Sequence, residues 1–159
     1  IFIYNTEDGS TLNINKIKTQ AGMRIMEHVG YDRYPVWSPD DSQIAIRSMR
    51  RPGNESDKDR LLVYNCAEKS FKEVTERFDY NAANVVWEGE ESIYFIAPIE
   101  ATHQVCRVAV ATGEVEVLTE GDHDINAFFF FNETAATEIY SGEDSLSLHD
   151  ALPITLLLR

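Results

Sequence analysis

The chain has 159 residues, of which 43% are hydrophobic, and 27 acidic against 14 basic side chains give a net charge of −13. This length predicts about one domain with a sizeable core. The acidic balance argues against a nucleic-acid binder or a protein that docks on anionic membranes, because both need clustered Lys and Arg. No run of about 18 apolar residues is present, which argues against a transmembrane helix. The two cysteines, Cys66 and Cys106, do not make a disulfide framework.

The first residues already have the character of a strand. Ile1–Tyr4 are β-branched and aromatic, and the turn-forming cluster Asn5–Ser10 follows them. A domain seldom begins inside a strand, so we expect the sequence to be truncated at this end. The best helical candidate, Gln20–His28, is short and contains Gly22. No segment has a sustained helical period.

The body of the chain repeats. Tyr34–Met49 and Ala83–Pro98 each contain a short apolar strand that ends in Trp, a polar turn, and an alternating strand, and Trp37 and Trp87 lie 50 residues apart. Pro at the second turn position and Asp or Gly at the later ones suit a tight turn. The two tryptophans are expected at equivalent, largely buried positions.

The second half of the unit repeats as well. Leu61–Tyr64 and Phe71–Val74 read as a hairpin that ends in Thr-Glu, and Val105–Val110 and Glu114–Leu118 read as its counterpart. Four antiparallel strands at a period of about 44 to 50 residues are typical of propeller blades.

These units predict an all-β fold, the arc of a β-propeller. The outer strands of one blade (about 1–14) precede two complete blades, about Tyr34–Glu76 and Asn81–Glu120, and the inner strands of a fourth follow at about Ile125–Tyr140. About three blade-equivalents of four-stranded sheet do not close a ring of about 4–8 blades. We therefore expect an open arc.

Several segments of the sequence are similar to one known family. WSPDD (37–41), IAIRSMRRPGNESDKDRLLVYN (44–65), FDYNAANVVW (78–87) and LTEGDHDI (118–125) resemble the propeller of prolyl oligopeptidase family serine peptidases, in the dipeptidyl-peptidase and acylaminoacyl-peptidase branch. The most specific part is Ser48–Tyr64, which contains the long insertion at Ser48–Arg60. Asp41 stands where the family has Gly, and Glu88–Glu91 replaces a second SPD turn.

The resemblance implies an enzyme of two domains. In that family a propeller restricts access to an α/β-hydrolase domain, where a Ser-His-Asp triad performs acyl transfer on peptides. This sequence has no G-x-S-x-G motif. We therefore expect the catalytic residues to lie beyond Ser145, in sequence not present here, and we predict no catalytic residue, metal or cofactor site in this chain.

Charged residues crowd the insertion. Arg50, Arg51, Glu55, Asp57, Lys58, Asp59 and Arg60 follow one another closely. One interpretation is contact with substrate termini or with the hydrolase domain. The other, which we favour, is a solvated loop of local ion pairs, each worth little.

Other candidate sites are weaker. Asp122, Asp124, Asn126 and Glu133 match four positions of a calcium loop, but Ala127 stands where that loop needs Gly. The histidines, His28, His103 and His123 among them, lack metal-binding spacing. Cys66 and Cys106 are expected to be reduced, partly buried side chains. Trp37, Trp87 and Phe131 are expected to be core residues of successive blades.

The C-terminal end has an unusual sequence. Ser147–Ile154 read SLHDALPI, which is the translation of a common sequencing-adapter oligonucleotide. We therefore expect residues 1–145 to be the partial propeller domain and residues 146–159 to be a non-native tail. We expect this tail neither to pair with the blades nor to pack on them, because Pro153 would interrupt a strand.

Two functions from different classes fit this sequence. The first is the non-catalytic, substrate-gating propeller part of a serine peptidase, with peptides as its partners. The second is a non-enzymatic propeller that scaffolds protein partners, as in the periplasmic Tol system. The insertion at 48–60 favours the first. A periplasmic or secreted location is expected from the resemblance rather than a cytoplasmic one.

Overall fold

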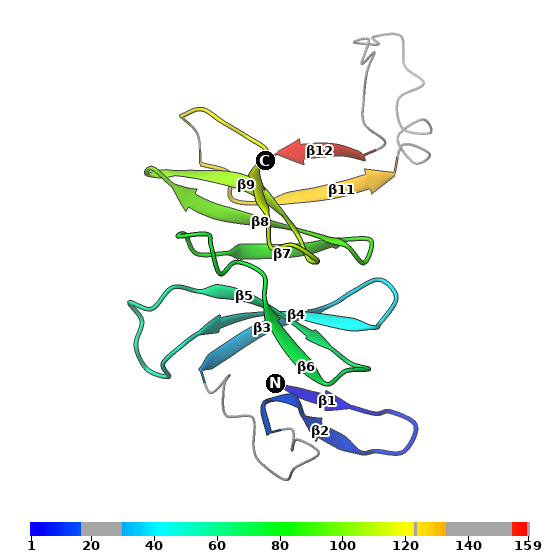
Figure 1. Ribbon diagram of the computed structural model, residues 1–159. Coiled ribbons are helices and arrows are strands. Elements are labelled where there is room, and N and C mark those ends of the chain that lie inside the picture. The colour runs from blue at the N-terminus through cyan, green and yellow to red at the C-terminus, as the bar shows by residue number, and fades with distance from the viewer. Residues whose placement is uncertain (17–29, 123, 133–153, 159) are drawn as a thin grey trace.

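The computed structural model describes residues 1–16, 30–122, 124–132 and 154–158 (Figure 1). Its elements are strands, apart from one turn of 3-10 helix, η1 (Ile14–Lys16), which follows the hairpin of β1 (Phe2–Tyr4) and β2 (Thr11–Asn13). None of the described residues forms a helix of a length and apolarity that would cross a membrane. The weak helical candidate in the sequence, residues 20–28, lies outside the described residues.

Two four-stranded antiparallel meanders make up the centre of the molecule. The first sheet contains β3 (Tyr31–Trp37), β4 (Gln43–Met49), β5 (Arg60–Asn65) and β6 (Ser70–Glu73). The second sheet contains β7 (Ala83–Glu88), β8 (Ser92–Ile99), β9 (Thr102–Ala109) and β10 (Val115–Val117). In each, every strand pairs with its neighbour in sequence, as the repeat predicts.

The two sheets repeat in detail. Trp37 pairs with Ile44 in the first sheet, and Trp87 pairs with Ile93 in the second. A threonine follows each fourth strand, and its hydroxyl oxygen accepts a 2.9 Å hydrogen bond from a backbone N–H of the third strand. In the first sheet the pair is Thr75 with Leu61. The expected equivalence of the two units is therefore confirmed.

A shared apolar core holds the sheets face to face. Leu61 and Val63 of the first sheet form one buried cluster with Ile93, Phe95 and Val108 of the second. Figure 1 shows the sheets stacked in chain order, from the β1–β2 hairpin to the last pair of strands, without closing into a ring. The prediction of an all-β open arc is confirmed.

The outer faces of the two sheets are covered as well. Ile14 packs with Ile44 and Tyr64 on the face of the first sheet that points away from the second. On the far face of the second sheet, Phe128 of β11 (Phe128–Asn132) packs with Ile96. Smaller two-stranded units therefore lie on both sides of the two complete sheets.

The tail differs from our expectation. β12 (Ile154–Leu158) pairs antiparallel with β11, from Phe128 opposite Leu158 to Asn132 opposite Ile154. The expectation that residues 146–159 stay unpaired is wrong for this strand, because an open edge offers unpaired N–H and C=O groups to any extended apolar segment. That 146–159 are non-native stays a prediction, and residues 146–153 lie outside the described part.

The two tryptophans differ in burial. Trp87 is 7% exposed, and its Nε1–H donates a 3.0 Å hydrogen bond across the sheets to the backbone oxygen of Val36. Trp37 is 44% exposed. The expectation of burial is confirmed for Trp87 and wrong for Trp37. The reason is that Trp87 faces the first sheet, whereas the cluster around Ile14 covers β4 and β5 and leaves Trp37 on β3 uncovered.

Trp87→Phe removes both the buried indole N–H and part of the volume between the sheets. It should lower the free energy of unfolding by about 2 kcal/mol. Trp37→Phe is the matched control and should change it by less than about 0.5 kcal/mol. Denaturant unfolding followed by circular dichroism measures both values. Equal losses would contradict the difference in burial.

Gly113, in the turn between β9 and β10, lies close to the backbone of the chain that leaves the first sheet. Its φ is +72°, and a Cβ there would lie 3.1 Å from the backbone oxygen of Val74. Gly113→Ala should therefore cost more than the roughly 1 kcal/mol of a left-handed alanine. Gly53→Ala is the control: Gly53 has a similar φ of +77°, but a Cβ added there would have no atom within 4 Å. The control therefore measures the cost of the left-handed conformation alone. Thermal unfolding measures the stability of both variants. If Gly113→Ala destabilises the protein no more than Gly53→Ala does, the contact with the Val74 backbone is unimportant.

Candidate functional site

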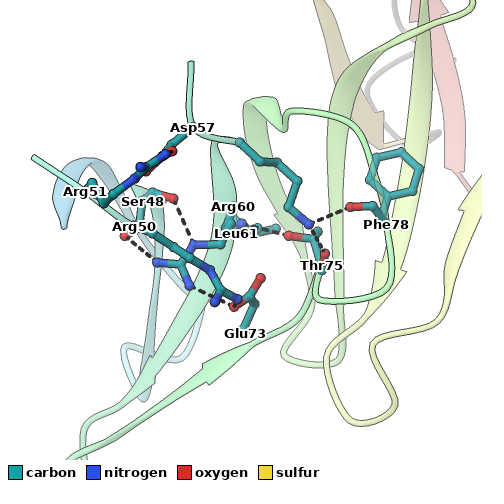
Figure 2. Close-up of polar contacts among 10 residues, drawn as sticks. Ser48, Arg50, Arg51, Asp57, Arg60, Leu61, Glu73, Thr75 and Phe78 are labelled. Carbon is teal, nitrogen blue, oxygen red and sulfur yellow. Dashed lines mark hydrogen bonds and ion pairs between the residues drawn. The ribbon is translucent and has the colours of Figure 1, made fainter. Parts of the chain in front are cut away.

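The charged loop, residues 50–59, joins β4 to β5 and lies beside the crossover, residues 74–82, that leads to the second sheet (Figure 2). The insertion singled out in the sequence therefore does connect the second and third strands of one sheet. Two turns, around 51–54 and 54–57, shape the loop through backbone hydrogen bonds.

One ion pair closes the outer part of the charged loop. Arg51 Nε donates to both carboxylate oxygens of Asp57 at 3.1 Å, and Asn54 Nδ2 donates to the same carboxylate at 2.6 Å. The hydrogen bond from Arg51 lowers the pKa of Asp57 to about 2. The arginine side chain is 71% exposed, so the pair shapes the loop more than it stabilises the fold.

The inner part of the charged loop holds the crossover in place. Lys58 Nζ donates to the backbone oxygens of Thr75 at 2.9 Å and Phe78 at 2.7 Å (Figure 2). The backbone N–H of Asp59 donates to Asn81 Oδ1 at 2.7 Å, and its oxygen accepts from the N–H of Ala82 at 3.1 Å. Two consecutive loop residues therefore fix the path of the chain between the sheets.

Glu73 on β6 binds two of the arginines. The Arg60 side chain, 7% exposed, lies 2.8 Å from the Glu73 carboxylate and donates from Nε to the backbone oxygen of Ser48 at 3.3 Å. Arg50 lies 3.4 Å from the same carboxylate with 67% of its side chain exposed. Figure 2 shows both guanidinium groups directed at Glu73. The expectation of local ion pairs is therefore supported, whereas the expectation of a solvated loop is wrong for Asp59 and Arg60, which are buried.

A second group of charges, the arginine cluster (Arg33, Arg47 and Asp59), lies where β3 and β4 meet the charged loop. Asp59 is 2% exposed, and its Oδ2 accepts from Arg33 at 2.8 Å and from Arg47. The guanidinium of Arg47 lies 4.9 Å from the ring centre of Tyr34, and that of Arg33 lies 5.2 Å from the ring centre of Tyr31. The hydrogen bond to Asp59 raises the pKa of Arg33.

The sequence pointed to Asp59 but missed both of its partners. Arg33 and Arg47 are cross-strand neighbours within apolar strands, so only the strand register shows that they meet. Alternation with Ile44 and Ile46 puts Arg47 on the opposite face of its strand, so the alternation gave no signal that its side chain would be largely buried. Side chains of this kind are almost never buried unless paired.

The described residues of the remaining candidate sites do not assemble into a site. In the part of the chain that the structure describes, no three His, Cys, Asp or Glu side chains are grouped for a metal ion. Asp124 instead lies 2.9 Å from Nδ1 of His103. Glu133, His28 and His123 lie outside the described residues, and so does the side chain of Phe131.

Neither cysteine has the character of a nucleophile. Burial raises the pKa of the Cys106 thiol to about 12, and it also raises the pKa of the Cys66 thiol. Both thiols are free, with Cys106 buried and Cys66 partly buried, which confirms the expectation from the sequence. A raised pKa keeps a thiol in the unreactive, protonated form.

Comparison with known proteins relates the chain to peptidases. No family model matches it. It is 37% identical over 144 residues to dipeptidyl-peptidase 5 of Porphyromonas gingivalis, across 90% of this chain and 20% of that protein. It is 32% identical over 129 residues to dipeptidyl-peptidase 5 of Porphyromonas endodontalis, across 80% of this chain and 17% of that protein. The chain thus spans about a fifth of the length of these relatives, and the similarity fits a fragment of a peptidase.

Lys58→Met keeps the aliphatic stem but removes the ammonium group from the carbonyls of Thr75 and Phe78. We expect a loss of about 2 kcal/mol in the free energy of unfolding, because two partly buried acceptors lose a charged donor. Lys72→Met is the control, since Lys72 also reaches a carbonyl, that of Ala111, but at an exposed position. Water replaces that donor, so the control should stay within about 0.5 kcal/mol. Equal effects in urea unfolding would refute the anchoring role.

Proposed function

We propose that this chain is a non-catalytic, substrate-gating propeller portion of a serine peptidase that releases dipeptides or acylated residues from peptides. The observation that carries the proposal is the 37% identity with a dipeptidyl-peptidase over 90% of the chain. The open arc of two complete sheets and the insertion between β4 and β5 are consistent with it. In the proposed enzyme the catalytic groups lie on an α/β-hydrolase domain outside this sequence.

The proposal assigns the chain a gating role and no chemical step. Acyl transfer by a serine peptidase needs a serine nucleophile, a histidine base and an oxyanion hole. The sequence has no G-x-S-x-G motif, and burial raises the pKa of both thiols. The contribution left to this chain is selection of the substrate, through the surfaces that its sheets and rim loops present to an incoming peptide.

The proposal is tested by exchanging segments with a relative. The stretch of the Porphyromonas gingivalis dipeptidyl-peptidase that aligns with residues 31–120 is replaced by this chain's residues 31–120. If that stretch is a blade pair of the same enzyme type, the chimera should keep kcat/KM for a chromogenic dipeptidyl substrate within about tenfold. A chimera that unfolds cooperatively but loses activity by more than about a hundredfold would contradict the proposal.

A second measurement tests the absence of chemistry in the chain itself. The isolated chain is incubated with a serine-directed fluorophosphonate probe, with the Porphyromonas enzyme as the positive control. We expect no site-specific labelling of the chain by mass spectrometry. Stoichiometric labelling of one serine would show that the chain carries its own nucleophile and would overturn the non-catalytic role.

A further inference from the structure

The arginine cluster carries more positive charge than its buried partner neutralises. Two guanidinium groups share the single carboxylate of Asp59, in a chain whose net charge is −13. Nε of Arg33, Nε of Arg47 and Oδ1 of Asp59 are buried without a hydrogen-bond partner. Buried polar groups in a native fold are nearly always paired, so the two unpaired guanidinium N–H donors need an explanation.

The fold does not require this cluster, because the second sheet is built without it. Arg33 pairs with Arg47 just before a break in register, and at the same place in the second sheet Ala83 pairs with Ile96. The backbone oxygen of Asp59 accepts from the N–H of Ala82 at the end of the crossover, and in the second sheet the backbone oxygen of His103 accepts from the N–H of Ile125. None of these counterparts forms an arginine–carboxylate group, yet the strand order and the break in register are the same. The second sheet has a short turn at residues 100–101 where the first has the charged loop.

Tyr34 gives a second sign of a specialised site. Its φ is +53°, and its counterpart at the bulge of the second sheet, Asn84, has a φ of +49°. Asn tolerates this left-handed conformation, whereas a bulky aromatic residue seldom adopts it. Strain of this kind gathers at binding sites. Here it places the ring of Tyr34 within 5.5 Å of the guanidinium of Arg33 and 4.9 Å of that of Arg47.

The cluster remains open to solvent. Arg33 and Arg47 have 28% and 17% of their side chains exposed, and Asp59 occupies one terminal nitrogen of each. Each guanidinium has five N–H donors in a planar fork that matches a carboxylate. Tyr31 and Tyr34, at 52% and 59% exposure, leave much of their ring surface free beside these donors.

We propose that Arg33 and Arg47, flanked by Tyr31 and Tyr34, bind a carboxylate group of a peptide at the rim of the first sheet. The charge selects an anion, the guanidinium forks select a planar one, and the two rings provide apolar walls for the adjoining peptide. That the carboxylate belongs to a peptide rests on the proposed function, whereas the recognition of a carboxylate rests on the cluster alone.

The test uses the full chain and three acetylated alanine tetrapeptides in calorimetric titrations. One has a free C-terminal carboxylate, one has a C-terminal amide, and one has the amide and a central Glu. At least one acidic peptide should bind about tenfold more tightly than the neutral one. The tighter of the two acidic peptides shows whether the carboxylate comes from a chain end or from a side chain. Equal affinity for all three would overturn the proposal.

Variants separate binding from folding. Arg33→Gln should weaken binding of the preferred peptide by about tenfold, whereas Arg51→Gln, which removes an exposed arginine of the charged loop, should leave it unchanged. Tyr34→Asn introduces the residue that the second sheet uses and should raise the melting temperature while it weakens binding by about threefold. A folded Tyr34→Asn or Arg33→Gln protein with undiminished affinity would refute the assignment. The titrations test the carboxylate site and the chimera tests the peptidase function. Because the two experiments are independent, one proposal can fail while the other holds.

Discussion

The structure depends on one constraint, which is that a four-stranded sheet with two apolar faces cannot exist alone in water. The face of the first sheet that carries Leu61 and Val63 is buried only because Ile93 and Phe95 of the second sheet lie against it. The same requirement explains why Ile14 and Phe128, from the partial units, cover the outer faces. Burial between layers is the main favourable contribution to such a fold.

Polar contacts then set the geometry of that packing. The apolar interface has no direction of its own, so the distance and rotation of the sheets come from specific groups. The indole of Trp87 reaches the Val36 backbone, and Lys58 and Asp59 fix the crossover between the sheets. A dense run of charges in the sequence thus acts as structural support at the place where the chain passes from one sheet to the next.

The sequence allowed the strands, their order and the repeat to be predicted, because each depends on local alternation and turn residues. It did not allow the burial of Trp37 to be predicted, since burial depends on what covers β3 rather than on the motif. It also hid the meeting of Arg33 with Arg47 and Asp59, which are close only through strand register and a loop. The pairing of Ile154–Leu158 with β11 could not be predicted either, because an open strand edge accepts segments of little sequence specificity.

The neighbour-to-neighbour order of strands has a kinetic consequence. Every strand within the two sheets pairs with the strand before or after it, so each pairing closes a short loop and costs little chain entropy. The strands of either sheet could pair transiently, but a sheet with two apolar faces persists only once the other sheet lies against it. Contacts across the sheets, such as that between Trp87 and Val36, therefore form together with docking, so their loss should slow folding as well as accelerate unfolding.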